Sequence, residues 1–275
     1  MTKIFEYFII KPFRKLVFEI TVLQNNYFYT KLFYFYSLLT KNNQSIYFNQ
    51  DAFYLKKKNW KFSNKSIGLM TYHAGLKKRG EKLRSIYLLN NIKFKKNDII
   101  IDCGANNGDF FLCFNKKIKY FGIEPSPNIF KNLKYNVKNQ KLFNIAFWKD
   151  NKKKINFYLK DEYGDSSIIR MKNYTKKITV NCQTLDNFVK SINKKIKLIK
   201  IEAEGAEPEV VYGLKNQLKK IQYIVIDVGY ERGNSQESTL VDCTNYLLKN
   251  NFRLIDFNSK TSRVIIMFKN NVLYK

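Results

Sequence analysis

The chain has 275 residues and 45% hydrophobic composition, so it can bury the core of a full α/β domain and is not disordered by composition. Its formal net charge of +28 favours polyanionic partners, although scattered lysine runs are also typical of a solvated surface. Four cysteines without CxxC spacing and a single histidine argue against a zinc site or a disulfide framework. These features, with no evident secretory leader and no 18-residue apolar stretch, predict a cytoplasmic protein without a transmembrane helix.

The first third of the chain is basic and aromatic. Residues 1–97 carry 19 basic and 4 acidic side chains, and 17 aromatic residues lie among the first 60. Apolar residues recur at helical spacing over 13–23, and a second apolar block covers 27–39. We predict a helical extension over 1–60 and a connecting helical segment over 61–97. The extension is interpreted as a cap on the main domain, with contact to an anionic membrane as the alternative.

From residue 98 onward, apolar strand patterns alternate with helical patterns. Strands are predicted over 99–103, 118–123, 142–147, 155–159, 178–182, 196–201, 221–228, 252–257 and 263–268. Helices are predicted over 109–115, 128–139, 185–192, 207–218 and 240–250. Such alternation predicts one α/β domain over 98–275, with a mostly parallel, Rossmann-like sheet covered by helices on both faces.

A glycine-containing loop joins the first of these strands to the next helix. Gly104 and Gly108 follow Asp102, and glycine permits backbone conformations and close approaches that a Cβ forbids. Glu124 ends the next strand, 20 residues after Gly104, where an acid can accept hydrogen bonds from both hydroxyls of a ribose. Loop and acid together predict a cofactor that contains a nucleoside, beside a helix start that offers free N–H groups.

The loop pattern also selects among such cofactors. Gly104-x-x-x-Gly108 is not the G-x-G-x-x-G of a dinucleotide site, and no GK[ST] of a P-loop follows. S-adenosylmethionine has no phosphate but carries an ammonium and a sulfonium, which suit the acid at Asp102. The loop therefore predicts S-adenosyl-L-methionine as the cofactor.

Five segments resemble the FkbM family of methyltransferases in residue types, order and spacing. They are residues 101–108, 123–127, 144–146, 184–186 and 198–207, and the resemblance covers roughly residues 80–257. The most family-specific piece is the block 198–207, which ends in Glu204-Gly205-Ala206-Glu207.

The resemblance implies a class I methyltransferase fold, O-methylation, and substrates that are often sugars or other secondary metabolites. It also implies which residues bind the cofactor: Asp102, Gly104, Ala105, Asn106, Asn107, Gly108, Glu124 and Ser126, with Asn144 and Ala146 beside the adenine. Ser166 and Ser167 would border the methionine end.

Two acids are candidates for the catalytic base that takes the proton of an acceptor hydroxyl. Glu202 is the first, as base or as a group that positions the acceptor, and Glu204 is the second. The family commonly has Asp at the position of Glu202, which is one methylene longer. Glu204 could instead accept backbone N–H bonds in the turn at Gly205. Glu202 with Asp227 is a thin basis for a metal site, and no metal is predicted.

The resemblance therefore implies transfer of a methyl group to an oxygen of a small molecule or glycan, with a sugar or glycan hydroxyl as the expected acceptor. One alternative is a nucleic-acid methyltransferase, but the basic excess lies in residues 1–97 rather than around the cofactor loop, and no RNA-binding motif is present. The other is a catalytically inactive, membrane-associated module of the same fold, whose peripheral contact with anionic lipid would come from residues 1–60.

Overall fold

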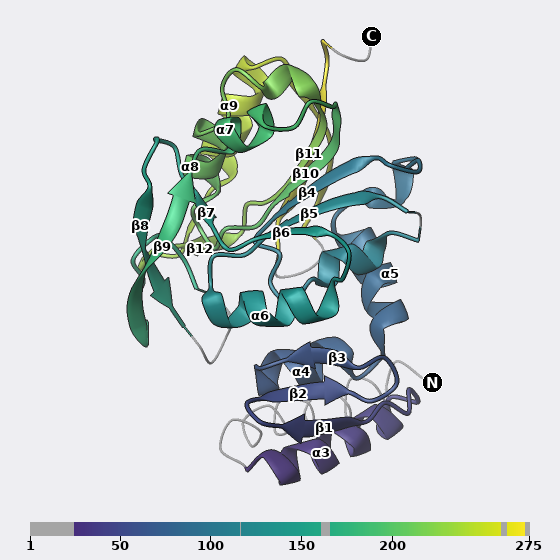
Figure 1. Ribbon diagram of the computed structural model, residues 1–275. Coiled ribbons are helices and arrows are strands. Elements are labelled where there is room, and N and C mark those ends of the chain that lie inside the picture. Colours follow the sequence, from purple (N-terminus) through teal and green to yellow (C-terminus); the bar gives the residue numbers. More distant parts are fainter. Residues whose placement is uncertain (1–24, 116, 161–165, 260–262, 273–275) are drawn as a thin grey trace. The chain divides into compact units, whose positions relative to one another are not determined.

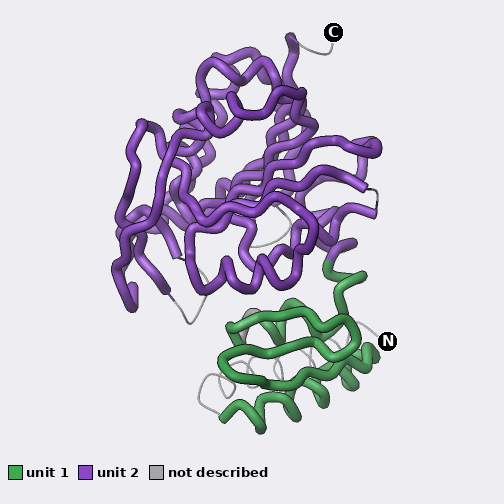
Figure 2. Tube along the Cα trace, viewed as in Figure 1, with its two compact units in different colours: residues 1–79, 161–164 green, residues 80–160, 165–275 purple. Residues whose placement is uncertain are grey.

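The computed structural model describes residues 25–115, 117–160, 166–259 and 263–272 (Figure 1). The helix expected over 13–23 lies outside these residues. The chain divides into two compact units, residues 1–79 with 161–164 and residues 80–160 with 165–275 (Figure 2). Among the described residues, no helix has the length and apolar character needed to cross a membrane.

Unit 1 contains a small antiparallel sheet with strand order β1-β2-β3. Its described elements are α3 (Asn26–Leu39), β1 (Ile46–Asn49), β2 (Ala52–Leu55), β3 (Trp60–Phe62) and α4 (Lys65–Tyr72). The side chain of Asn25 starts α3 by accepting the N–H of Phe28 at 2.8 Å. The core is mostly aromatic, with Tyr29, Phe33, Phe53, Phe62 and Tyr72 each at most 2% exposed.

This unit differs from the helical extension expected over 1–60 and from the boundaries at 60 and 97. Only α3 is helical between residues 25 and 60, because the short aromatic runs after it pair through tight turns at Gln50 and Asn59, both with positive φ. The division falls at residue 79 because Gly80, within α5 (Leu76–Ile86), already packs against the second unit. A Cβ at Gly80 would lie 2.3 Å from the carbonyl oxygen of Leu112.

Unit 2 is built on a seven-stranded sheet with the order β14-β15-β11-β10-β4-β5-β6. Its strands are β4 (Ile99–Cys103), β5 (Lys119–Ile123), β6 (Lys141–Phe143), β10 (Ile196–Ile201), β11 (Ile221–Asp227), β14 (Phe252–Asn258) and β15 (Ile265–Asn270). Neighbours from β11 to β6 pair in parallel, and β15 is antiparallel to β11 and β14. The predicted mostly parallel α/β sheet is confirmed.

Helices lie on both faces of this sheet (Figure 1). They are η2 (Leu89–Asn91), η3 (Asp109–Cys113), α6 (Pro127–Asn136), α7 (Leu185–Lys190), α8 (Glu207–Tyr212), η4 (Leu218–Lys220) and α9 (Leu240–Lys249), where η marks a 3₁₀ helix. Side chains alternate between the two faces of the sheet along β4, and each face has its own core. Ile99 and Ile101 belong to the core beneath α7, α8 and α9. Ile100 belongs to the core beneath α5, η3 and α6.

The remaining strands form two small sheets. One has the order β7-β9-β8, from β7 (Ala146–Phe147), β8 (Lys154–Leu159) and β9 (Lys176–Gln183), and the other pairs β12 (Tyr230–Arg232) with β13 (Glu237–Ser238). The strand expected over 142–147 is therefore two strands in different sheets. The helix expected over 207–218 ends at Tyr212, because Gly213 packs against the backbone of Trp148, where a Cβ would lie 2.4 Å from a carbonyl oxygen.

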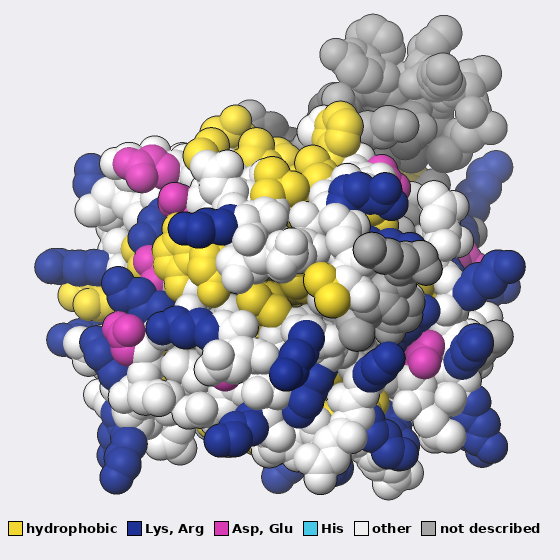
Figure 3. All heavy atoms as spheres, turned by 90° about the horizontal axis from the view of Figure 1, so that it is seen from above, with side chains coloured by type: hydrophobic (Ala, Val, Ile, Leu, Met, Phe, Trp, Pro, Cys, Tyr) yellow, Lys and Arg dark blue, Asp and Glu magenta, His cyan; other side chains and the backbone are white. Residues whose placement is uncertain are grey.

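The surface carries many dispersed lysines, as the sequence suggested. Figure 3 views the molecule from the side of α7 and α9 and shows Lys and Arg spread over the face, with apolar side chains gathered among them. Exposed apolar side chains in this part of unit 2 include Val241 and Leu248 of α9. All four cysteines are buried free thiols.

Candidate functional site

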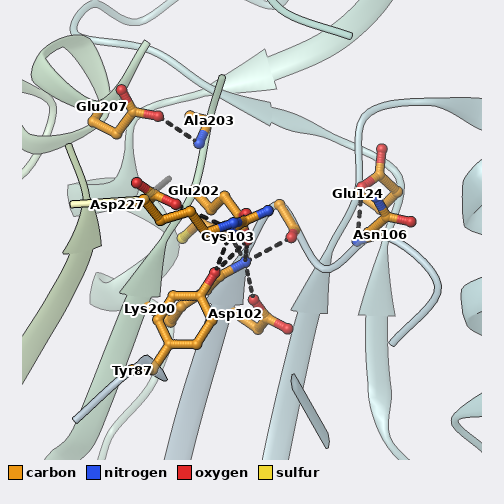
Figure 4. A network of polar contacts seen from close by, with 12 residues as sticks. Tyr87, Asp102, Cys103, Asn106, Glu124, Lys200, Glu202, Ala203, Glu207 and Asp227 are labelled. Atoms are coloured by element: carbon orange, nitrogen blue, oxygen red, sulfur yellow. Dashed lines mark hydrogen bonds and ion pairs between the residues drawn. The ribbon is translucent and has the colours of Figure 1, made fainter. Parts of the chain in front are cut away.

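Most predicted site residues lie at or just after the carboxyl ends of neighbouring parallel strands, β5, β4, β10 and β11 (Figure 4), whereas Asn144 follows β6 and Ala146 lies in β7. After β4 the chain continues to β5 and β6 on one side, and it later returns to β10 and β11 on the other. The strand order thus reverses between β4 and β10. Ligands of open α/β sheets bind outside the strand ends at such a reversal.

Gly104 is required by the protein's own backbone. It has φ +78°, and a Cβ there would lie 1.9 Å from the carbonyl oxygen of Glu202 at the end of β10. The close approach that glycine permits here is one between two strand ends. Gly108 has φ +94° and begins η3, which is five residues long rather than the seven predicted.

The N–H groups of residues 104–108 all have partners inside the protein. The first two donate to the carbonyl of Ile123 at 3.0 and 2.8 Å, and the third donates to Glu124 at 3.0 Å. The last two bond within the loop, each at 2.8 Å. Residues 104–108 therefore present no run of donors for a pyrophosphate, and the free N–H groups expected at the start of the following helix stay a prediction.

Glu124 is held at the end of β5 by backbone donors. Its two carboxylate oxygens accept the N–H of Asn106 at 3.0 Å and of Ser126 at 2.8 Å. The Asn144 side chain donates to the carbonyls of Glu124 and Pro125, which fixes the segment that carries the acid. Burial raises the pKa of Glu124 to about 7. Each oxygen keeps an acceptor position for a further hydrogen bond.

Three predicted cofactor residues have buried side chains. Ala105 and Ala146 are 3% and 1% exposed within apolar clusters, and Ala146 belongs to β7 outside the main sheet. Asn107 is 4% exposed, and its side chain and carbonyl accept hydrogen bonds from Asn132 and Asn136 of α6. Of these residues, Ala105 and Asn107 hold the loop against its surroundings.

Asp102 is buried beneath the loop and paired with a cation of this chain. Its carboxylate lies 3.0 Å from the ammonium of Lys200 and accepts a hydrogen bond from the hydroxyl of Tyr120. Lys200 is also 2.8 Å from Glu202 and donates to the carbonyl of Gly104 at 2.8 Å. Asp102 exposes none of its side chain and neutralises Lys200, while its contact with a cofactor ammonium stays a prediction.

The ammonium of Lys200 stays protonated in this environment. Burial is the largest single effect and would lower its pKa, but the charge of Asp102, the hydrogen bond to Asp102 and the interaction with Tyr87 together outweigh it, and the pKa is raised. Lys200 lies in β10 and Glu202 directly follows the last residue of this strand, and the carboxylate of Glu202 lies 2.8 Å from the ammonium of Lys200.

Glu202 is the centre of the polar network in Figure 4. Tyr87 donates its hydroxyl hydrogen to this carboxylate at 2.6 Å, and Arg263 forms an ion pair with it. Arg263 also lies 3.0 Å from Asp227 and donates to the oxygen of Tyr87 at 3.1 Å. Glu202 and Asp227 do converge, but the guanidinium of Arg263 lies between them where a metal was considered.

The second catalytic candidate, Glu204, lies in a turn stabilised by a different acid. Glu207 is 1% exposed and accepts the N–H groups of Ala203 at 2.8 Å and Gly205 at 3.1 Å, and the hydroxyl of Thr239 at 3.1 Å. The backbone-binding role considered for Glu204 therefore belongs to Glu207. Glu204 has the unusual φ of +49°, which its place in the turn imposes.

Contacts from outside lock the same turn. Arg232 donates to the Gly205 carbonyl at 2.6 Å and pairs bidentately with Glu209 at 2.8 and 2.7 Å. The hydroxyl of Ser167 donates to the Glu204 carbonyl at 2.7 Å. Ser167 thus supports the turn that follows Glu202.

The predicted neighbour of Ser167 has a more local role. The hydroxyl oxygen of Ser166 accepts the N–H of Lys160 at 3.0 Å, which closes the loop between β8 and β9.

Comparison with known proteins agrees with this geometry. The methyltransferase FkbM domain model matches residues 102–254, more than half of the chain. The chain belongs to the FkbM methyltransferase family. Its predicted resemblance to that family is thereby confirmed, and the matched range includes both the Gly104 loop and the Glu202 turn.

This FkbM chain is similar to one related protein and to two solved structures. It is 26% identical over 179 residues to 2-O-methyltransferase NoeI of Sinorhizobium fredii, covering 57% of this chain and 73% of the relative. The precorrin 8W decarboxylase of Methanobacterium thermoautotrophicum shows 12% identity and a TM-score of 0.41 over 70% of this chain and 89% of its own. Magnesium protoporphyrin IX methyltransferase of Synechocystis PCC 6803 shows 8% identity and a TM-score of 0.37 over 74% and 83%.

Three residues of this FkbM site were not predicted from the sequence: Tyr87, Lys200 and Arg263. A signal existed for Lys200, because a lysine between two isoleucines of a fully buried strand needs a buried acid. Tyr87 and Arg263 lie outside the residues that the family model matches, and nothing in their local sequence points to Glu202.

Proposed function

We propose that this chain transfers a methyl group from S-adenosylmethionine to a hydroxyl oxygen of a sugar or glycan. Membership of the FkbM methyltransferase family and the name of the related 2-O-methyltransferase support the acceptor class. The observation that carries the cofactor is Glu124, a buried acid with spare acceptor positions beside a loop whose amides are all satisfied.

The residues present fit the nucleoside end of that cofactor. Glu124 would accept from the ribose hydroxyls, and Asn106 and Asn144, which are only half-buried, would border the base and sugar. The N–H groups of residues 104–108 already have acceptors inside the protein, which suits a cofactor without phosphate. When bound, S-adenosylmethionine supplies the electrophilic methyl group.

Glu202 would accept the proton of the acceptor hydroxyl as the oxygen–methyl bond forms. Lys200 and Arg263 stabilise its ionised form, and ionised carboxylate is the form that a base requires. After proton transfer neither cation is left without a counter-ion, because Lys200 still faces Asp102 and Arg263 still faces Asp227. The network therefore tolerates both protonation states of Glu202.

The test has two stages. Calorimetric titration with S-adenosylhomocysteine is expected to show binding, and Glu124→Ala is expected to abolish it while the variant still unfolds cooperatively. Screening of sugars, nucleotide sugars and glycans with methyl-labelled S-adenosylmethionine is then expected to yield a labelled ether that Glu202→Gln does not form. Absence of binding would refute the cofactor, and label transferred only to RNA would refute the acceptor class.

A further inference from the structure

Helix α3 of unit 1 has an exposed apolar side in addition to the side that it buries. Tyr27, Tyr34 and Leu38 are 69%, 42% and 43% exposed, and together with Lys31 they follow the spacing i, i+4, i+7, i+11. That spacing places all four on one side of a helix. We refer to Tyr27, Lys31, Tyr34 and Leu38 as the α3 stripe. The neighbouring Phe28 is 43% exposed.

The edge strand of the same unit adds further exposed aromatic surface. In β1, which packs against α3, Tyr47 and Phe48 are each 37% exposed. Tyrosine is suited to a boundary between oil and water, because its ring is apolar and its hydroxyl is polar.

Basic charge accompanies this apolar surface. Residues 25–79 contain ten Lys and Arg side chains and one acid, Asp51. Within the stripe, the ammonium of Lys31 lies 4.5 Å from the ring centroid of Tyr27, so a cation lies directly beside the apolar surface.

We propose that the α3 stripe binds the surface of an anionic lipid bilayer, with α3 lying in the plane of the interface. A helix of 14 residues is about 21 Å long, which is too short to span a bilayer but long enough to lie in the headgroup region. The aromatic and leucine side chains would enter the acyl boundary, and the basic residues of the unit would meet lipid phosphates. The proposal is independent of the methyl-transfer activity.

Charge favours lipid over a second copy of the chain, because two units with the same strong basic excess repel each other. The composition of the stripe favours lipid over RNA, because Leu38 offers neither a stacking ring nor a donor to a base. Both alternatives are included as outcomes of the experiment.

The experiment is co-sedimentation of the full chain with vesicles of phosphatidylcholine alone and of phosphatidylcholine mixed with phosphatidylglycerol. We expect binding to the mixed vesicles and much weaker binding to the neutral ones. The triple variant Tyr27→Ser, Tyr34→Ser, Leu38→Ser is expected to reduce partitioning into mixed vesicles by about tenfold or more, since it removes most of the inserted apolar area. Lys31→Glu is expected to weaken binding as well.

A matched control removes exposed apolar side chains of unit 2 instead. Val241 and Leu248 of α9 are 66% and 48% exposed, and the double variant Val241→Ser, Leu248→Ser is expected to bind vesicles like the parent. Circular dichroism melts establish that each variant is folded. Equal losses in the two sets of variants would overturn the proposal, as would vesicle binding that the stripe variant leaves intact. Preferential binding of the chain to RNA, lost in the stripe variant, or a dimer that this variant dissociates, would also overturn it.

Discussion

The hydroxyl of Tyr87 donates a hydrogen bond of 2.6 Å to the carboxylate of Glu202, although 115 positions of sequence separate the two residues. Arg263 reaches the same carboxylate from the other end of the chain. Both partners lie outside residues 102–254, which carry the family match. The most family-specific block thus supplies the acid, and flanking segments of this chain supply the groups that orient it.

Removing the Tyr87 hydroxyl tests that orientation. Tyr87→Phe keeps the ring and its edge-to-face contact with Phe110, whose centroid lies 5.2 Å away, but deletes the donor to Glu202. A hydrogen bond to a charged group contributes about 1.5–3 kcal/mol, so kcat is expected to fall by about 10- to 100-fold. The KM for S-adenosylmethionine is expected to stay unchanged. A fall in cofactor affinity that matches the fall in kcat would instead indicate a general disturbance of the site.

Two substitutions at Glu202 separate the effect of its charge from the effect of its side-chain length. Glu202→Gln keeps the size but cannot take a proton, and it is expected to lower kcat by about 10²–10⁴-fold with S-adenosylhomocysteine binding retained. Glu202→Asp restores the residue common in the family and is expected to keep measurable turnover, with the loss depending on how well Lys200 and Arg263 follow the shorter side chain. Rate constants from single turnovers measure the chemical step directly. Equal activity of the glutamine variant and the parent would eliminate the base.

The strands of the main sheet could be predicted from the sequence where burial on both faces requires apolar residues. Strands β4 and β10 begin and end at the predicted residues, because strands covered on both faces are mostly apolar, and each of these two is rich in isoleucine. Short strands such as β1, β2 and β3 were missed, because brief aromatic runs do not distinguish strand from helix until their partners are known.

The sequence predicted where the site residues lie in the sheet, but it did not predict which side chains contact one another. Glu124 and Glu202 were expected at strand ends, and the structure places both there. Asp102 also occupies its predicted strand, but no sequence pattern shows that Lys200, from a neighbouring strand, neutralises it. Such pairings depend on tertiary register rather than on local composition.

The cofactor affinity is expected to depend on pH through Glu124. Burial raises the pKa of this carboxyl from 4.5 to about 7. Between these two pH values the carboxyl is therefore protonated in the folded chain and ionised in the unfolded chain. The site's contribution to stability is therefore complete below pH 4.5 and disappears as pH rises through 7. Ribose hydroxyls donate best to the ionised form, so affinity for S-adenosylhomocysteine should rise with pH by up to about tenfold per unit and level off above 7.

Calorimetric titrations across that pH range measure this effect, with Glu124→Gln as the reference. The amide cannot ionise, so the variant should bind more weakly and with little dependence on pH. A parent protein whose affinity is flat from about pH 5.5 to 8.5 would show that Glu124 is not a ligand of the cofactor, or that it is ionised throughout.

A pair of glycine substitutions isolates the close approach between β4 and β10. Gly104 and Gly233 both have positive φ, +78° and +64°, so Ala at either position strains the backbone similarly and restricts the unfolded chain equally. They differ in space, since a Cβ at Gly233 meets nothing nearer than 3.7 Å, whereas at Gly104 it would lie 1.9 Å from the Glu202 carbonyl. Gly233→Ala should cost about 1 kcal/mol and Gly104→Ala clearly more than about 3 kcal/mol, because two strand ends must separate. Urea unfolding measures both free energies. Since the displaced carbonyl belongs to the proposed base, any folded Gly104→Ala protein should also lose methyl transfer, and equal costs at the two positions would show that the strand ends yield without resistance.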